Sequence, residues 1–368
     1  MNFPGLDLAW NGSHRAAHAL GLIRPWTLEQ ARAALAKNEK VLVVASTALG
    51  DSLLTTPLVD TLAHRLGPER VSLLVKAPYA ELYGKDPRLH RVLTVRGKYR
   101  WDDLAAQLRA DPHRIALLSN FTEPDLIPLL WRAGVRAFLR YRTRWTRYPG
   151  WMANRDMLRR PGEPDYATGH AIENNLAMAG ALGLEPGTHR LALPHIVRDK
   201  EGPYRLVVIH PGASRASKRW PAENWARLAD ALADKFGVGI SLSGDRSEQP
   251  LADEVARLMK SKKPANGAGI TPLPLLALLQ ANSLAFLSGD TGPYHLAIAV
   301  GCPTVTLFAP TDRGSSVEAC GPHQADPLLH RTLQTAQFGD PIATLSFERV
   351  LAEAVDVVGR ALARKESA

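Results

Sequence analysis

An acidic residue follows an apolar run near the start of the chain. The segment 42–67 opens with LVVA, tightens at Ala48-Leu49-Gly50-Asp51 and continues with helical spacing. Asp51 could cap the helix, because a carboxylate near a helix N-terminus accepts hydrogen bonds from free backbone N–H groups. It could instead face a ligand cleft and accept a proton as a general base. Both roles fit the local pattern.

A second acid lies in LAFLSGDTGPYHLAIAV at 284–300. Glycines let backbone amides approach a ligand, proline suits the first helical turn, and free N–H groups at a helix start favour phosphate. Asp290, Thr291 and Gly292 could therefore form a diphosphate site. The alternative is an ordinary turn in which Asp290 and Thr291 cap the helix. His295 could be either a packed core histidine or a pocket donor.

Two further loops offer groups suited to a nucleotide. The loop HPGASRASKRWPAENW at 210–225 carries small residues, among them Ser214, and then Lys218. A lysine there can neutralise phosphate oxygens without a metal, although the loop could also be a solvated basic segment. Glu248 follows a predicted strand end in LSGDRSEQP, where it could accept ribose hydroxyl protons or simply start a helix.

The segment 131–160 is strongly basic. It contains nine arginines and one acid, interleaved with aromatic residues. Arg142, Arg144 and Arg147 could hold a phosphorylated acceptor or rest on anionic lipid headgroups. Nucleic-acid binding and a solvated face are the other interpretations.

These residues follow short apolar runs that are typical of buried parallel strands. The runs lie at 41–45, 70–75, 91–95 and 114–120, and then at 204–212, 238–245, 284–292 and 303–311. Two series separated by a Gly- and Pro-rich segment predict two doubly wound α/β domains, with ligands beyond the carboxyl ends of the strands.

The predicted domains divide the chain into three parts. Residues 1–194 form an N-terminal acceptor domain and residues 195–345 a C-terminal nucleotide-sugar domain. Residues 346–368 have helical spacing and are expected to pack back on the N-terminal domain.

Composition narrows the class of protein. A chain of 368 residues is too long for one ordinary core, and 45% hydrophobic with 22% charged residues is typical of a globular protein. The formal charge of +9 favours an anionic partner. Only two cysteines are present, without a CxxC pattern, so neither a zinc site nor a disulfide framework is supported.

Several motifs are missing from the sequence. It has no GxxxxGK[ST] loop, no GxGxxG after a strand and no GxSxG, which argues against ATPase, NAD-dependent and esterase chemistry. No apolar stretch is long enough for a signal peptide or a membrane span, so we expect a cytoplasmic protein.

Four segments together resemble glycosyltransferase family 9, the bacterial lipopolysaccharide heptosyltransferases. They are ALGDSLLTTP, GHAIENNLAMAGALGL, IHPGASRASKRWPAENWARLADAL and SGDTGPYHLAIAVGCPTVTLFAPT, in this order, across roughly residues 40 to 311. The resemblance implies a GT-B fold, with two Rossmann-like domains facing a central cleft. It also implies inverting, metal-independent transfer of a heptose from ADP-heptose to a lipid A-linked inner-core acceptor, without a cofactor, at the inner face of the cytoplasmic membrane.

The resemblance also implies roles for individual residues. Asp51 would be the general base on the acceptor hydroxyl. Lys218, Asp290, Thr291 and Gly292 would meet the donor diphosphate, with Ser214 and His295 close by, and Glu248 would contact the ribose. The first 40 residues match nothing typical of the family, and the segment after Thr311 lacks a cysteine-bearing stretch seen in some of its members.

Two other classes of function remain open from the residues. One is a nucleotide-sugar epimerase or hydrolase of the same fold, which would turn over the donor without an acceptor. The other is a non-enzymatic protein that binds a sugar nucleotide or nucleic acid.

Overall fold

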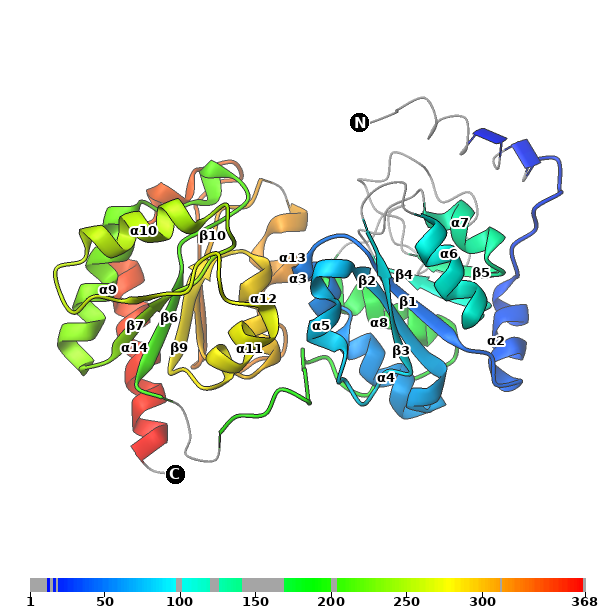
Figure 1. Cartoon of the computed structure of the whole chain (residues 1–368), viewed down its shortest axis with the longest axis horizontal. Helices are drawn as coiled ribbons and strands as arrows, with labels where there is room; N and C mark the ends of the chain where they lie inside the picture. The colour runs from blue at the N-terminus through cyan, green and yellow to red at the C-terminus, as the bar shows by residue number, and fades with distance from the viewer. Residues whose placement is uncertain are drawn as a thin grey trace. The chain divides into compact units, whose positions relative to one another are not determined.

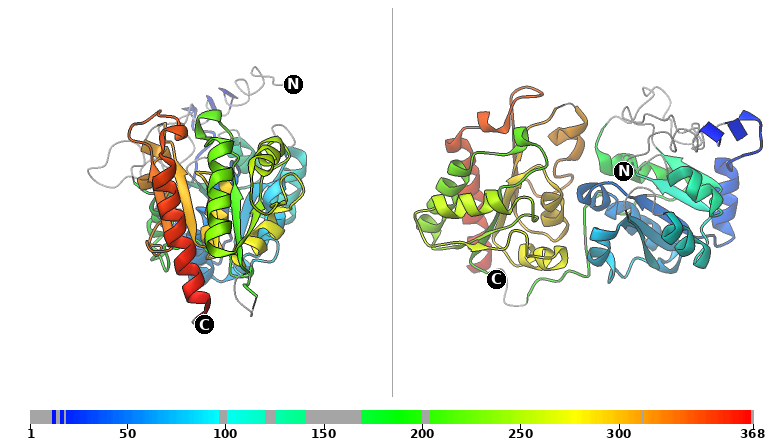
Figure 2. Two further views of the ribbon diagram at one scale, coloured as in Figure 1. Left: turned by 90° about the vertical axis from the view of Figure 1, so that its left-hand side faces the viewer. Right: turned by 45° about the horizontal axis from the view of Figure 1, so that its top comes forward.

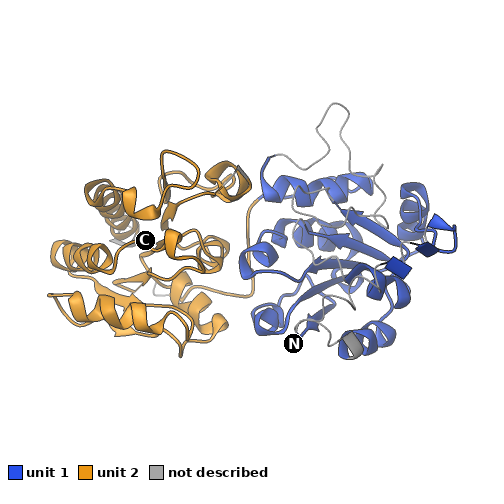
Figure 3. Ribbon diagram, turned by 90° about the horizontal axis from the view of Figure 1, so that it is seen from above, with its two compact units in different colours: residues 1–189 blue, residues 190–368 orange. Residues whose placement is uncertain are grey.

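The computed structural model describes residues 12–13, 16–17, 19–96, 101–119, 126–140, 169–199, 204–311 and 313–366 (Figure 1). The chain separates into two compact units, Met1–His189 and Arg190–Ala368, shown in different colours in Figure 3. The predicted boundary at Pro194 falls a few residues after this division. Each unit is an α/β domain, as predicted.

The N-terminal unit contains a parallel five-stranded sheet. Its strands are β1 (Val41–Ala45), β2 (Val71–Lys76), β3 (Arg91–Val95), β4 (Ile115–Leu118) and β5 (Ala137–Arg140), in the order β3-β2-β1-β4-β5. The central strand β1 is buried along its whole length, which explains its unbroken apolar run.

Helices surround this sheet in the usual manner of a doubly wound domain (Figure 1). They are α2 (Leu28–Ala36), α3 (Leu49–Leu53), α4 (Thr56–Leu66), α5 (Ala80–Tyr83), α6 (Trp101–Ala110), α7 (Leu126–Arg132) and α8 (Ala171–Ala181). Helices α6 and α7 share one apolar core with alternate residues of β1, β4 and β5, whereas α4 packs against α8. The turn from β1 into α3 carries Asp51.

The C-terminal unit contains a parallel six-stranded sheet. Its strands are β6 (Leu206–His210), β7 (Gly239–Leu242), β8 (Ala265–Asn266), β9 (Ala285–Gly289), β10 (Thr304–Phe308) and β11 (His330–Gln334), in the order β11-β10-β9-β6-β7-β8. Its helices are α9 (Ala222–Phe236), α10 (Gln249–Leu258), α11 (Leu273–Ala281), α12 (Gly292–Ala299), α13 (Val317–Cys320) and α14 (Phe347–Glu366). The loops after β6, β7 and β9 carry the predicted donor residues.

Helix α14 packs on the C-terminal unit, so the prediction that it returns to the N-terminal domain is wrong. Val350, Ala354, Val357 and Val358 form a buried stripe in the same core as Leu287 of β9, because they repeat at helical spacing. The left view of Figure 2 shows this helix in red alongside the strands of its own unit.

Polar contacts hold α14 in the same place. On β11, Arg331 Nη2 donates to Asp356 Oδ2 of α14 at 2.9 Å. The sequence predicted the helix and its apolar face, but helical spacing does not say which of two similar sheets that face covers.

Candidate functional site

The turn between β9 and α12 is not a capped turn of the ordinary kind. Thr291 holds the N-cap position with extended backbone angles, yet its side chain makes no capping hydrogen bond. Its Oγ1 is buried and has no partner among the residues that the structure describes. The backbone N–H groups at the start of α12 are therefore not satisfied by this hydroxyl, which leaves them for a ligand.

Asp290 pairs with a residue far away in the sequence. Lys218 Nζ donates to Asp290 Oδ2 at 2.8 Å, and both side chains are largely buried, with 15% and 12% exposure. Gly289 allows this approach, because a Cβ there would lie 3.3 Å from the Lys218 carbonyl oxygen. The fold thus brings the loops after β6 and β9 together, as the donor-site prediction requires.

His295 lies one turn into α12 and is buried. Its Nδ1 has no hydrogen-bond partner within the described part of the chain. Burial lowers the pKa of His295 to about 4, opposed by the charge of Asp290 and assisted by that of Lys218. The imidazole is consequently neutral at neutral pH, and it lies within the electrostatic reach of the Lys218–Asp290 pair.

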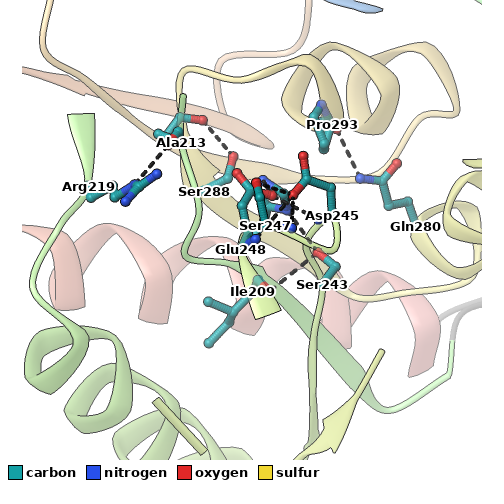
Figure 4. A network of polar contacts seen from close by, with 12 residues as sticks. Ile209, Ala213, Arg219, Ser243, Asp245, Ser247, Glu248, Gln280, Ser288 and Pro293 are labelled. Carbon is teal, nitrogen blue, oxygen red and sulfur yellow. Dashed lines mark hydrogen bonds and ion pairs between the residues drawn. The ribbon is translucent and has the colours of Figure 1, made fainter. Parts of the chain in front are cut away.

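Glu248 is held at the carboxyl end of the same sheet by a polar network (Figure 4). Its Oε2 accepts a hydrogen bond from the Asp245 N–H at 2.9 Å and lies 3.5 Å from His210 Nε2. Its carboxyl group packs directly over Gly212, where a Cβ would overlap it. Although Glu248 holds the N-cap position of α10, its side chain makes no capping bond to that helix.

His210 was not singled out from the sequence. It ends β6, is buried, and places Nδ1 3.3 Å from Ser243 Oγ and Nε2 beside Glu248. Burial lowers its pKa, although the charges of Glu248 and Asp245 oppose this shift. The sequence HPG at 210–212 could have indicated this residue. A histidine that ends a strand just before a glycine lies close to any side chain that packs over that glycine, as Glu248 does here.

Asp51 caps its own helix. Its Oδ2 accepts hydrogen bonds from Thr47 Oγ1 at 2.5 Å and from the Ala48 N–H at 3.1 Å. The side chain is half-buried rather than sealed in the core. Burial raises the pKa of the nearby Tyr79 hydroxyl, and the charge of Asp51 raises it further. The capping interpretation therefore holds, and it leaves the catalytic one untested.

The other predicted residues have different outcomes. Ser214 is exposed on the loop that leads to Lys218. Arg142, Arg144 and Arg147 lie outside the described residues.

A histidine and a glutamate lie close together in the N-terminal unit. Glu173 Oε1 and His189 Nδ1 lie 2.6 Å apart. Metal independence stays a prediction.

Comparison with known proteins identifies the class of protein that this arrangement represents. Residues 178–330 match the model of glycosyltransferase family 9 (heptosyltransferase). The resemblance to this family is confirmed over these residues, and the protein is a glycosyltransferase.

Individual relatives are lipopolysaccharide heptosyltransferases. Lipopolysaccharide heptosyltransferase 3 of Escherichia coli is 26% identical over 291 residues, covering 72% of this chain and 80% of that protein. Lipopolysaccharide heptosyltransferase 1 of Pseudomonas aeruginosa is 26% identical over 296 residues, covering 75% and 80%.

Solved structures show that the fold is GT-B. A family 9 glycosyltransferase from Veillonella parvula aligns with a TM-score of 0.71 at 19% identity, covering 88% of this chain and 97% of the other. The heptosyltransferase WaaC of E. coli, solved with ADP, aligns with a TM-score of 0.69 at 20% identity, covering 86% and 99%. Within the described residues, no helix is both long and apolar enough to span a membrane.

Proposed function

We propose that this protein transfers a heptose from ADP-heptose to a lipid A-linked inner-core acceptor, with inversion and without a metal. The observation that carries the proposal is the buried Lys218–Asp290 pair beside the start of α12. The names of the relatives, and of the E. coli structure solved with ADP, support the choice of donor and reaction.

The donor diphosphate would bind at this pair. An ammonium group has three donor hydrogens, so Lys218 can keep its bond to Asp290 while it donates to phosphate oxygens. The N–H groups of Thr291 and Gly292 would add backbone donors, and the dipole of α12 favours negative charge at this end. These groups would stabilise the charge that develops on the departing ADP.

Other residues would orient the nucleotide. Glu248 would accept hydrogen bonds from the ribose hydroxyls, because its carboxylate lies at the carboxyl end of β7 and caps no helix. Neutral His295 would donate to the donor without adding a second positive charge beside Lys218. Ser214, exposed on the Lys218 loop, would add a hydroxyl donor.

Asp51 would act on the acceptor. It would take the proton of the acceptor hydroxyl while that oxygen attacks the anomeric carbon, and the bond from this carbon to the diphosphate oxygen would break on the opposite side. Thr47 and Ala48 donate to Oδ2 from neutral groups, and these two bonds would hold the carboxylate in place for this step.

The acceptor side of the proposal includes Arg142, Arg144 and Arg147, which would contact a phosphorylated glycolipid. An acceptor of this kind is anchored in a bilayer. We therefore also propose that the protein works in peripheral contact with the inner face of the cytoplasmic membrane.

Product analysis tests the proposal. The protein is incubated with ADP-heptose, with or without a lipid A-linked inner-core acceptor and in the presence of a chelator. We expect ADP and an extended glycolipid of inverted anomeric configuration only when acceptor is present. Release of ADP at the same rate without acceptor would show hydrolysis instead, and a new nucleotide sugar would show epimerisation.

A further inference from the structure

A buried arginine in the N-terminal unit has no charge partner among the residues that the structure describes. Arg140 is the last residue of β5 and is 5% exposed. Its Nη2 atom is buried, and the described residues give it no hydrogen-bond acceptor. Burial lowers the pKa of Arg140 to about 10, so the guanidinium still carries its charge at neutral pH.

Arg88 is a second buried arginine of the same unit, and it has carboxylate partners. It is nearly as buried, at 9% exposure, but donates to Asp86 at 2.7 and 2.9 Å and to Asp60 at 3.2 Å. Burial disfavours its charged form, yet the hydrogen bonds and charges of Asp86 and Asp60 more than offset this and raise its pKa. A buried charge without such partners destabilises a fold, unless a ligand supplies the missing charge.

The register of the sheet places Arg140 precisely enough to identify its surroundings. Val44 pairs with Leu118, and Leu118 pairs with Arg140, so the three form one row across β1, β4 and β5. Strands are about 4.8 Å apart, which puts this arginine roughly 10 Å from β1. Val44, Leu118 and Phe138 belong to one core cluster, and Arg140 continues the face of Phe138 because strand side chains alternate.

A second unpaired polar group lies at this end of the sheet. Ser46 directly follows β1 and is fully buried, and its Oγ has no partner among the described residues. It comes two residues after Val44, so it continues the same face as Arg140. Asp51 lies in the first turn of the helix that follows. Both unsatisfied groups thus lie at the carboxyl ends of parallel strands, where ligands bind in such sheets.

We propose that Arg140 is a binding site for an oxyanion of the acceptor, either a phosphate or a carboxylate, with Ser46 as a neighbouring donor. The planar guanidinium can donate two parallel hydrogen bonds to either group, and exclusion of water strengthens that pairing. The site rests on the proposed function only in naming the acceptor as the source of the anion. The position is distinct from the donor site, which lies in the other unit.

The unfolding temperature of the full chain tests this site. It is measured with saturating ADP, at constant ionic strength, while inorganic phosphate or acetate is added. We expect at least one of these anions to raise the unfolding temperature, and we expect Arg140→Met to abolish that rise. Because the methionine removes an unpaired buried charge, the variant without anion should unfold at or above the temperature of the wild type.

Arg88→Met is the matched control. It should lower the unfolding temperature, since it leaves Asp86 buried without its cation, and it should keep the rise caused by the anion. Arg140→Lys keeps the positive charge but loses the planar pair of N–H donors. It should need a roughly tenfold higher anion concentration for the same rise in unfolding temperature. Arg140→Lys thus gives a second reading of the site that does not depend on the methionine variant.

Three outcomes overturn the site: neither anion stabilises the wild type, the rise persists in Arg140→Met, or that variant is destabilised like Arg88→Met. Failure of ADP itself to stabilise the protein would contradict the proposed function instead. The anion titration is then read without ADP in the Lys218→Ala background, which lacks the cation of the diphosphate site.

Discussion

Two turns of the molecule share a pattern and use it differently. Asp51 follows β1 in the N-terminal unit, and Asp290 follows β9 in the C-terminal unit, each at the start of a helix. Asp51 accepts hydrogen bonds from Thr47 and Ala48 in its own turn, whereas Asp290 accepts one from Lys218, which belongs to another loop.

The difference bears on what each carboxylate can do. A carboxylate bonded to a buried ammonium is compensated, and its main effect is to hold that cation in place. The two bonds that Asp51 accepts within its turn come from neutral donors, so neither Thr47 nor Ala48 supplies a compensating charge. The comparison agrees with the proposed roles, in which Asp51 would accept a proton and Asp290 would position Lys218.

The largest expected effect is the loss of turnover rate when Asp51 is replaced. Asp51→Asn should slow transfer by ~10²–10⁴, as removal of a general base does, because asparagine keeps the shape but accepts no proton. The turnover rate with saturating donor and acceptor is the measurement. Asp60→Asn, an acid of the same unit that pairs with Arg88, is the control. An unchanged rate in Asp51→Asn would remove this residue from the mechanism.

The next effect concerns the ribose contact. Gly212→Ala should displace the Glu248 carboxyl group, because the added Cβ would overlap it. We expect ADP to bind roughly tenfold more weakly, the loss typical of one hydrogen bond to a charged group. ADP that lacks both ribose hydroxyls should bind the wild type and the variant equally.

Gly239→Ala gives a matched comparison for this change. A Cβ at that position would make an ordinary contact, 3.4 Å from Leu206 Cδ1. The Gly239→Ala variant should therefore bind ADP with the affinity of the wild type. Equal losses for both nucleotides in Gly212→Ala would argue that the alanine disturbs the loop rather than Glu248.

The smallest effect is a dependence of stability on pH. Burial holds the pKa of His295 at about 4, below its ordinary value of 6.5. Between these values the unfolded chain binds a proton that the folded chain excludes, so the free energy of unfolding decreases as the pH falls. His295→Gln should remove about 1.4 kcal/mol per pH unit of that decrease, measured by urea unfolding.

His330 provides the control for this measurement. Burial also lowers its pKa to about 4, but it lies on β11 and takes no part in the proposed donor site. His330→Gln should flatten the pH dependence similarly and leave ADP binding unaltered. A slope that His295→Gln does not change would mean that His295 is not buried in its neutral form.

The sequence predicted most of the fold because buried parallel strands have a strong signal. Unbroken apolar runs marked β1 and β9, and helical spacing marked α14. Three edge strands were not predicted: β5, β8 and β11. Strand β5 reads AFLR inside the basic segment 131–160, β8 is only two residues long, and β11 reads HRTLQ. An edge strand buries fewer side chains, so its run is broken by polar residues.

The site was predictable only in part, for a physical reason. Sequence patterns placed Lys218 and Asp290 at strand ends, but their ion pair depends on how two distant loops approach each other. The roles of His210 and Arg140 depend on burial and on which partners are present, and neither quantity is visible in residue type. Asp51 is the opposite case. Its capping bonds join residues of one turn, so capping was one of the two roles that the sequence pattern indicated.

Calorimetric titration of ADP tests the division of roles most directly. Wild type, Lys218→Ala and Asp51→Asn are compared, with Lys235→Ala on the exposed side of α9 as a further control. We predict that Lys218→Ala binds ADP about tenfold or more weakly, while Asp51→Asn and Lys235→Ala bind it as the wild type does. Wild-type affinity in Lys218→Ala, or a comparable loss in Asp51→Asn, would contradict the account.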